Sequence, residues 1–455
     1  MKIKNNNETR NPSPPPLTEA ERQSISGDLI GSTIFSQHWV LDTLLKLYKH
    51  EESTVYTTSN KDIEEDEKTP EHTTLLSTDQ TECSSNKKRS LESGFENDLC
   101  QLWDMTANTE VAHFLNENDI KSVLRDALKR TRSPRLMEIC FGILGNMLCV
   151  KEIRISYTAV AAAENMDCGE FRAELLSYLT VIDALSLVEL TRLLCTCVSC
   201  SSCSSLWVRD LLGNMNHVGQ LTYLLKNTLN VDLLSHVVKI LDVLFDEMNS
   251  EQFNDHFVTV DLVTGLIEAY DQFNDNGTKS EYFVSLIHLL QLVATESNKC
   301  AELVTKDSDV IFKFFEKYFK ILDSDEGRSD FQVFERLTIY ASILSLLVTM
   351  SVELKGNIIK FMIKNIDFME QCLDYLRNIV ENGHSGISVY LSICMEALSP
   401  LLNQLFAFNS TNGIEQSDLA TLQIRIDDLL KTIGQSTLYE SLDEMCASIE
   451  NCKKL

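Results

Sequence analysis

Proline and glycine are scarce in this sequence, and their scarcity limits the possible folds. The chain of 455 residues contains 16 glycines and seven prolines, of which only Pro134 and Pro400 lie beyond residue 70. Sheet proteins need frequent turns, and those turns are built mainly from Gly, Pro, Asn and Asp. The composition therefore disfavours a β-rich fold and favours long helices.

Long apolar runs are missing as well. No window approaches 18 uninterrupted apolar residues, so the sequence predicts no membrane span. The opening stretch MKIKNNNETRNPSPPP lacks the apolar core of a secretory signal. We therefore expect a nuclear or cytoplasmic chain whose 14 cysteines stay mostly reduced.

The signatures of the common enzyme classes are also absent. We find no Gly-rich phosphate loop, G-x-S-x-G elbow, H-E-x-x-H pair or kinase motif. The nine histidines are scattered, and His288, within SLIHLLQLV, is interpreted as a core or groove residue. The sequence thus predicts a protein that is not an enzyme, has no catalytic residue and uses no cofactor.

Positive charge is in short supply. The chain has 67 Asp and Glu against 40 Lys and Arg, a net charge of −27, and residues 1–95 account for only −5 of it. So acidic a body repels nucleic-acid backbones and anionic lipid surfaces. We expect a monomer with protein partners, particularly partners with basic segments, and no direct binding to nucleic acid or membrane.

The composition divides the chain into four parts. Residues 1–27 are polar and proline-bearing, as is typical of a disordered tail, and residues 28–48 are predicted to form an amphipathic helix. Residues 49–94, which include the acidic run DIEEDEK, predict a flexible linker. From residue 95 to 455 the helical periodicity barely stops, and this part is predicted to be one helical domain.

The predicted N-terminal helix has a clear apolar face. Its large apolar residues cluster by three-and-four spacing at Trp39, Leu41, Leu44, Leu45 and Tyr48. We expect this helix to cap the end of the helical domain, and we expect a chain without residues 1–48 to aggregate.

A long apolar helix recurs along the rest of the chain. Six such segments, about 50 residues apart, begin at Pro134, Ile182, Val231, Glu281, Glu335 and Gly386, with shorter and more polar helical stretches between them. A helix that is apolar all round is buried between neighbours. This alternation predicts an all-α fold, an armadillo- or HEAT-like α-solenoid. An irregular all-helical domain is the alternative.

Four cysteines lie within nine residues in the stretch CTCVSCSSC, at Cys195, Cys197, Cys200 and Cys203. A zinc site usually takes two ligand pairs, each on a tight turn, from separate segments. Here the run continues an apolar helix, on which Cys195 and Cys197 point to opposite faces. We interpret the first two cysteines as core residues and the last two as part of a helix end or loop, with no metal site. A metal- or redox-responsive module centred on this run is the alternative.

Residues 121–135 concentrate basic side chains within the acidic body. Lys121, Arg125, Lys129, Arg130, Arg132 and Arg135 stand against one acid, Asp126. The first three are four residues apart and share one helical face. We call these six residues the basic stripe and treat them as a candidate binding surface for an acidic or phosphorylated segment, including the chain's own DIEEDE. A solvated helix face is the alternative.

Three smaller features remain. FGILGNML contains Gly142 and Gly145, where we expect close interhelical packing, and Asn146, a candidate groove residue. Ser13, which precedes Pro14, is a candidate phosphorylation site. The basic triplet Lys87, Lys88 and Arg89 is a candidate nuclear-import signal.

Several of these segments together resemble the serum amyloid A-like (SAAL) protein family. They are NPSPPP at 11–16, DLIGSTIFSQHW at 28–39, LWDMT and VAHFL within 102–115, SPRLMEICFGILGNMLC at 133–149, LWV at 206–208 and NVDLLSHVVKILDVLFD at 230–246. The resemblance covers residues 11 to about 250, and beyond that point only the helical character matches.

The resemblance implies an armadillo-like helical fold, no known catalytic activity, a largely nuclear location and a role in promoting cell proliferation. In armadillo proteins, an asparagine like Asn146 grips the backbone of an extended peptide, but a tryptophan usually stands where this chain has Gly142. The family pattern matches Cys197 and not the other three cysteines of the run. We therefore expect a non-enzymatic helical-repeat scaffold that acts through protein–protein contacts.

Overall fold

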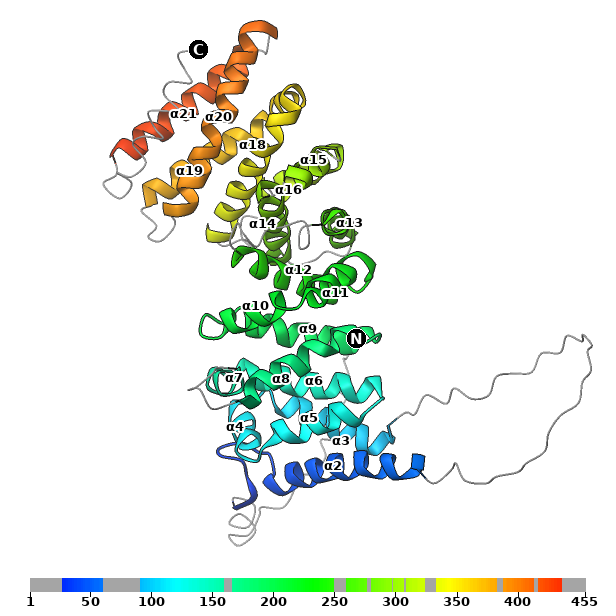
Figure 1. Ribbon diagram of the computed structural model, residues 1–455. Coiled ribbons are helices and arrows are strands. Elements are labelled where there is room, and N and C mark those ends of the chain that lie inside the picture. The colour runs from blue at the N-terminus through cyan, green and yellow to red at the C-terminus, as the bar shows by residue number, and fades with distance from the viewer. Residues whose placement is uncertain are drawn as a thin grey trace, which may run out of the picture. The chain divides into compact units, whose positions relative to one another are not determined.

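The computed structural model describes residues 27–59, 91–158, 166–248, 259–275, 280–296, 298–306, 308–323, 333–382, 388–412 and 416–435. Within these ranges the regular secondary structure is α-helical, apart from the short 3-10 helix η1 (Tyr178–Thr180) and an isolated β-bridge between Leu29 and Ser36. The predicted all-α class is confirmed. Two compact units are present, Met1–Tyr157 and Thr158–Leu455, which we call unit 1 and unit 2 (Figure 1).

Four predictions from the sequence fall on other parts of the chain. The linker predicted over 49–94 overlaps helices at 49–59 and 93–94. Its residues 60–90, residues 1–26 of the tail, Ser13 and the triplet Lys87–Arg89 lie outside the described residues. These four stay predictions.

Unit 1 is a group of helices packed around α6. Its helices are α2 (Gln37–Ser59), α3 (Ser93–Met105), α4 (Thr109–Glu117), α5 (Ile120–Arg130), α6 (Pro134–Cys149) and α7 (Lys151–Thr158). Helix α6 packs against α3, α4 and α5, and α2 covers α3 and α5. The start of α6 follows from its sequence, because Pro134 occupies the first turn and the Ser133 side chain caps the backbone N–H of Leu136.

The N-terminal helix begins and ends later than predicted. It was expected over residues 28–48 but runs from Gln37 to Ser59. The preceding residues form a turn instead, in which Ile30 N–H donates to Phe35 O at 2.9 Å and the Asp28 carboxylate accepts from the Ser36 hydroxyl and from His38 N–H. These local bonds compete with helix formation, which is why the apolar spacing misplaced the boundary.

The buried face of α2 also differs from the predicted one. Val40, Thr43, Leu44 and Leu47 are buried, whereas Leu41, Leu45 and Tyr48 are 40%, 48% and 45% exposed. The helix carries two adjacent apolar stripes, and the stripe that contains Leu47 packs on α3 and α5. Spacing alone did not distinguish the two stripes.

Because α2 has one buried and one exposed apolar stripe, a substitution on each stripe tests how the helix packs. Leu47→Ala should lower the free energy of unfolding by about 2–5 kcal/mol, because it opens a cavity in the core of unit 1. Leu45→Ala, two residues away on the exposed stripe, should change it by no more than about 0.5 kcal/mol. Urea unfolding of the full chain, followed by circular dichroism, measures both. Equal losses in the two variants would show that the face is assigned wrongly.

Within the described residues, unit 2 is built of helices, one after another. They are α8 (Met166–Ser177), η1, α9 (Ala184–Val198), α10 (Ser204–Leu212), α11 (Met215–Asn227), α12 (Val231–Asp246), α13 (Val260–Asp275), α14 (Ser280–Glu296), α15 (Asn298–Lys306), α16 (Ser308–Asp323), α18 (Val333–Lys364), α19 (Ile366–Asn382), α20 (Ser388–Asn412) and α21 (Gln416–Gln435). Helix α18 is interrupted at Leu354, whose φ of −110° and ψ of 28° are not helical.

The long apolar helices of unit 2 pack in chain order. Helix α9 contacts α12, α12 contacts α14, α14 contacts α18, and α18 contacts α20 (Figure 1). A second set of contacts joins α11 to α13 and α19 to α21. All six long apolar segments predicted from the sequence are helices, α6 in unit 1 and these five in unit 2.

Two stretches of unit 2 are long and apolar enough to span a membrane by length and composition. They are Glu335–Val352 in α18 and Val389–Ala407 in α20, which are 67% and 50% buried inside the protein. Their contacts with α14, with α19 and with each other account for much of this apolar character. The expected absence of a membrane span stays a prediction.

Candidate partner-binding surfaces

The basic stripe lies on α5 and at the start of α6, and two of its members hold unit 1 together. Arg135 pairs with Glu96 of α3 and with Glu138, both at 2.8 Å, and its guanidinium also reaches Cys100 Sγ at 3.1 Å. Arg130 lies over the Tyr48 ring of α2, 5.6 Å from its centroid. Both side chains therefore have structural contacts within the unit.

Of the other four basic side chains, two are half-buried and two are exposed. Lys121 and Arg125 are half-buried, and the Lys121 ammonium lies 5.2 Å from the centroid of the Tyr157 ring. Lys129 and Arg132 are exposed. Lys121, Arg125 and Lys129 are on α5, as their four-residue spacing implies, and their role in binding a partner stays a prediction.

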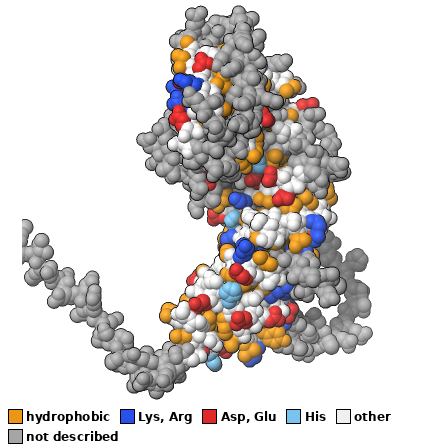
Figure 2. Space-filling model, turned by 90° about the vertical axis from the view of Figure 1, so that its left-hand side faces the viewer, with side chains coloured by type: hydrophobic (Ala, Val, Ile, Leu, Met, Phe, Trp, Pro, Cys, Tyr) orange, Lys and Arg blue, Asp and Glu red, His pale blue; other side chains and the backbone are white. Residues whose placement is uncertain are grey.

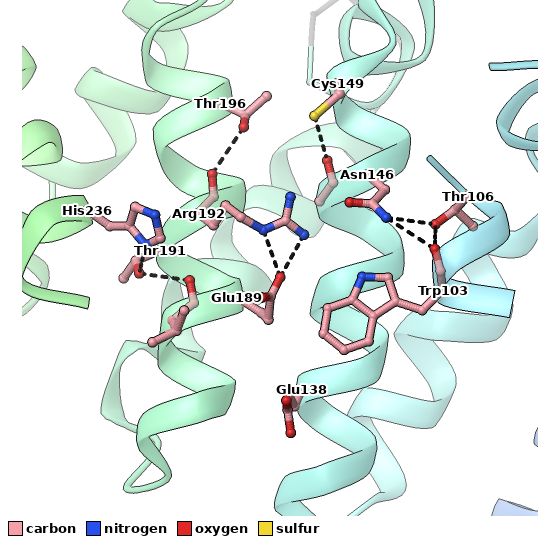
Figure 3. Close-up of polar contacts among 12 residues, drawn as sticks. Trp103, Thr106, Glu138, Asn146, Cys149, Glu189, Thr191, Arg192, Thr196 and His236 are labelled. Carbon is pink, nitrogen blue, oxygen red and sulfur yellow. Dashed lines mark hydrogen bonds and ion pairs between the residues drawn. The ribbon is translucent and has the colours of Figure 1, made fainter. Parts of the chain in front are cut away.

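Asn146 is engaged inside unit 1 (Figure 3). Its side-chain amide donates to the carbonyl of Trp103 and to the hydroxyl of Thr106, both at 3.2 Å. The Trp103 indole lies directly over Gly142, in the space that any larger side chain there would need. The predicted close packing at Gly142 is therefore confirmed, and the indole comes from α3. If Asn146 bound the backbone of a partner peptide in a groove, its side chain would first have to break these two hydrogen bonds.

The cysteine run spans the end of α9 and the start of α10. Cys197, Cys200 and Cys203 are buried, Cys195 is half-buried, and all four are free thiols. Cys195 donates to the backbone carbonyl of His236 at 3.3 Å, and Cys203 donates to that of Cys197 at 3.4 Å. The described residues contain no group of three metal-ligating side chains. Cys197 is a core residue as predicted, Cys195 is only half-buried, and Cys200 and Cys203 lie between the two helices as expected but are buried. The absence of a metal site stays a prediction.

The reactivity of the thiols follows from this burial. Burial raises the pKa of Cys195 to about 12, so its thiolate is rare at neutral pH. On brief treatment of the native chain with N-ethylmaleimide, we expect the exposed Cys149 to be modified before the cysteines of the run. Cys195, Cys197 and Cys203 should react only after unfolding, and peptide mass spectrometry measures each site. Fast labelling of the run in the native chain would contradict this packing.

Polar side chains gather on one surface of α9 and α12 in unit 2 (Figure 3). The Arg192 guanidinium pairs with Glu189 at 2.6 Å, and the Thr191 hydroxyl lies 3.2 Å from His236 Nδ1. Burial lowers the pKa of His236 to about 4, so this histidine is neutral at physiological pH. These groups form a polar surface.

A second histidine pair lies between α12 and α14. His288 Nδ1 is 2.7 Å from an Asp242 carboxylate oxygen, and both side chains are largely buried. Burial opposes protonation of His288, but the hydrogen bond with Asp242 and the charges of Asp242 and Asp246 outweigh it and raise the pKa above the usual value. The negative charges of both aspartates act on the hydroxyl of Tyr390 in α20 and help to raise its pKa. This hydroxyl is hydrogen-bonded with Thr338 of α18. We call Asp242, Asp246, His288 and Tyr390 the Asp–His–Tyr cluster.

The sequence contains a signal for this surface that we did not use. On α12, the residues Asp232, His236, Lys239, Asp242 and Asp246 are spaced by four, three, three and four positions, which places them on one face of an otherwise apolar helix. Each of them is half-buried or exposed. The helical spacing of these polar residues therefore marks the polar face of α12 in the sequence, just as the spacing of apolar residues marks a buried face.

A hollow of about 420 Å³ lies elsewhere on unit 2, between α11 and α13. Met215, Gly219 and Tyr223 line it, and the ion pair between Lys226 and Asp261, at 2.6 Å, lies beside them. In space-filling view, one face of the molecule shows such exposed apolar side chains next to charges of both signs (Figure 2).

The described residues thus define an all-helical protein whose long apolar helices carry paired polar side chains along one face. A family model described as the SAAL1 C-terminal domain matches residues 218–453. The chain belongs to the SAAL1 family of serum amyloid A-like proteins, which confirms the resemblance seen in the sequence. The expectation that the C-terminal part shares only helical character with the family is wrong, because the matched domain lies there.

Three similar proteins extend the comparison. Protein saal1 of Danio rerio is 32% identical over 310 residues, which cover 66% of this chain and 58% of that protein. Protein SAAL1 of Mus musculus is 35% identical over 240 residues, 52% of this chain and 44% of that protein. Protein SAAL1 of Homo sapiens is 32% identical over 220 residues, 48% of this chain and 40% of that protein. None of these names denotes an enzymatic activity.

Proposed function

We propose that this chain is a non-enzymatic helical-repeat scaffold, an armadillo- or HEAT-like α-solenoid that binds protein partners along the polar faces of its long helices. The observation that carries the proposal is the series α9, α12, α14, α18 and α20, in which each helix packs against the next. Solenoids bury apolar faces by stacking in this way, and they leave extended surfaces on which partners dock.

The chemistry of the polar faces supports binding rather than catalysis. On α9, Glu189 and Arg192 are paired with each other, and on α12 burial keeps His236 neutral. An enzyme would need a nucleophile or base that is poised to exchange protons with a substrate. A binding surface needs only fixed charges and hydrogen-bonding groups.

The charge of unit 2 indicates the kind of partner. Residues 158–455 contain 42 Asp and Glu against 21 Lys and Arg, a net charge of −21. A surface with this charge attracts basic segments and speeds their association. From the family resemblance, we further propose a nuclear location and a role in promoting cell proliferation, which fluorescence imaging and growth assays of cells lacking the protein would test.

Proximity labelling in cells tests the scaffold proposal. The wild-type chain is compared with a charge reversal of Lys121, Arg125 and Lys129 and, separately, with Asp246→Lys on α12. We expect at least one reversal to remove a defined subset of labelled proteins. Glu268→Lys, an equal change of charge at an exposed position of α13, serves as the control. Identical labelled sets from all four forms would refute binding through these faces.

A further inference from the structure

We infer that the Asp–His–Tyr cluster binds an arginine or lysine side chain from a basic segment of a partner protein. The inference rests on the proposed function and assigns to it a contact point and a class of partner. The cluster lies on the outward polar face of α12, extended by one residue from α14 and one from α20.

The geometry brings three helices to one place. Asp242 and Asp246 are one turn apart near the end of α12, and His288 of α14 is bonded to Asp242 at 2.7 Å. Tyr390, near the start of α20, is half-buried and lies within electrostatic reach of both aspartates. Asp246 is exposed, and within the part of the chain that the structure describes it has no ion-pair partner.

The electrostatics of this place favour a cation. Asp246 and Glu247 stand at the C-terminal end of α12, where the helix dipole is negative, and no basic residue occupies the last turn of that helix. Acidic groups at a helix C-terminus repel the backbone carbonyls, and a docked positive charge relieves that repulsion. An acidic peptide or a phosphate group would increase that repulsion. Lys239 is the cation that α12 itself contributes to this face.

The aromatic ring selects an organic cation over a metal ion. The aromatic ring of Tyr390 can form a cation–π contact with a guanidinium or ammonium group. A divalent metal would require several oxygen or nitrogen ligands that converge on one point. The described residues contain no group of three such ligands.

His288 makes the binding depend on pH. While His288 is protonated, its charge offsets that of Asp242, and when it loses its proton the cluster becomes more negative. Affinity for a basic segment should therefore rise as pH increases through the pKa of His288, which lies above 6.5. The other titratable groups that face it are Asp242, Asp246 and Tyr390, and burial raises the pKa of Tyr390 so that it stays neutral. Helix α18 contributes Thr338, which does not titrate.

Fluorescence anisotropy of the full chain with fluorescein-labelled nona-arginine tests the inference. At constant salt and pH 8, Asp246→Lys should weaken binding about tenfold, and the milder Asp246→Asn should have a smaller effect in the same direction. Tyr390→Leu should weaken it about two- to fivefold. Between pH 6 and pH 8 the wild-type affinity should increase, and His288→Gln should remove that increase. Circular dichroism confirms that each variant is folded.

The control is Glu268→Lys on α13, which changes the total charge equally and should leave most of the affinity intact. Equal weakening by Glu268→Lys and Asp246→Lys, or a pH dependence that survives His288→Gln, would overturn the inference. The two proposals can fail separately. If nona-arginine does not distinguish the variants while proximity labelling still depends on Asp246, the scaffold stands and the cationic contact is wrong.

Discussion

Asp210→Asn should strongly destabilise unit 2, because it removes the carboxylate that pairs with a buried guanidinium. Arg172 of α8 is only 2% exposed, and its Nε lies 2.6 Å from an oxygen of Asp210 in α10. Removing one partner of such a buried pair costs about 3–5 kcal/mol, since the remaining charge stays away from water. We expect urea unfolding, followed by circular dichroism, to show a loss of this size.

Two further variants separate the buried charge from general damage. Asp261→Asn breaks the exposed pair with Lys226 and should have little effect, because solvent screens that pair. The double substitution of Arg172 by Met and Asp210 by Leu should recover much of the lost stability, since well-packed apolar residues often replace a buried ion pair without cost. If Asp261→Asn were as damaging as Asp210→Asn, burial would not be the cause.

Gly142→Ala should destabilise unit 1, although alanine is the better helix former. At most interior helix positions this change is favourable by about 1 kcal/mol. Here the added methyl group would overlap the Trp103 indole, so α3 and α6 would have to move apart. Overpacking of this kind costs about 1–3 kcal/mol. Chemical unfolding gives the net change, and tryptophan fluorescence reports whether the indole shifts.

Gly219→Ala provides the matched control for this substitution. Gly219 is in the middle of α11, and open space surrounds the position of its missing side chain. The same chemical change should therefore stabilise the chain there. A double-mutant cycle with Trp103→Leu completes the test, because the cost of Gly142→Ala should shrink once the indole is gone. Stabilisation by both alanines would mean that Trp103 does not occupy the space over Gly142.

The features that could be predicted from the sequence are those with local causes. The start of α6 depends on Ser133 and Pro134, which are adjacent, and the long apolar helices follow from their own composition. The burial of Cys197 follows from its position on an apolar helix. Each of these can be derived within a single window of the sequence.

The features that were missed depend on residues far apart in the chain. Arg135 was assigned to a binding stripe, but its partner Glu96 is 39 positions away and comes from α3. The indole over Gly142 also comes from α3. The Asp–His–Tyr cluster combines residues of α12, α14 and α20, so no single window contains it. The hydrophobic periodicity of a helix predicts which of its faces is buried, but it does not predict which other helix packs against that face.

The turn before α2 has a consequence for how the chain tolerates cleavage. Ser32 donates its backbone N–H and its hydroxyl to the Glu110 carboxylate, at 2.6 and 2.8 Å, and the neighbouring Gly31 leaves room for that carboxylate. Together with the buried side chains of α2, these bonds fasten the first segment to residues beyond position 90. A protease that cuts once between residues 60 and 90 should therefore yield two fragments that migrate together until they are denatured.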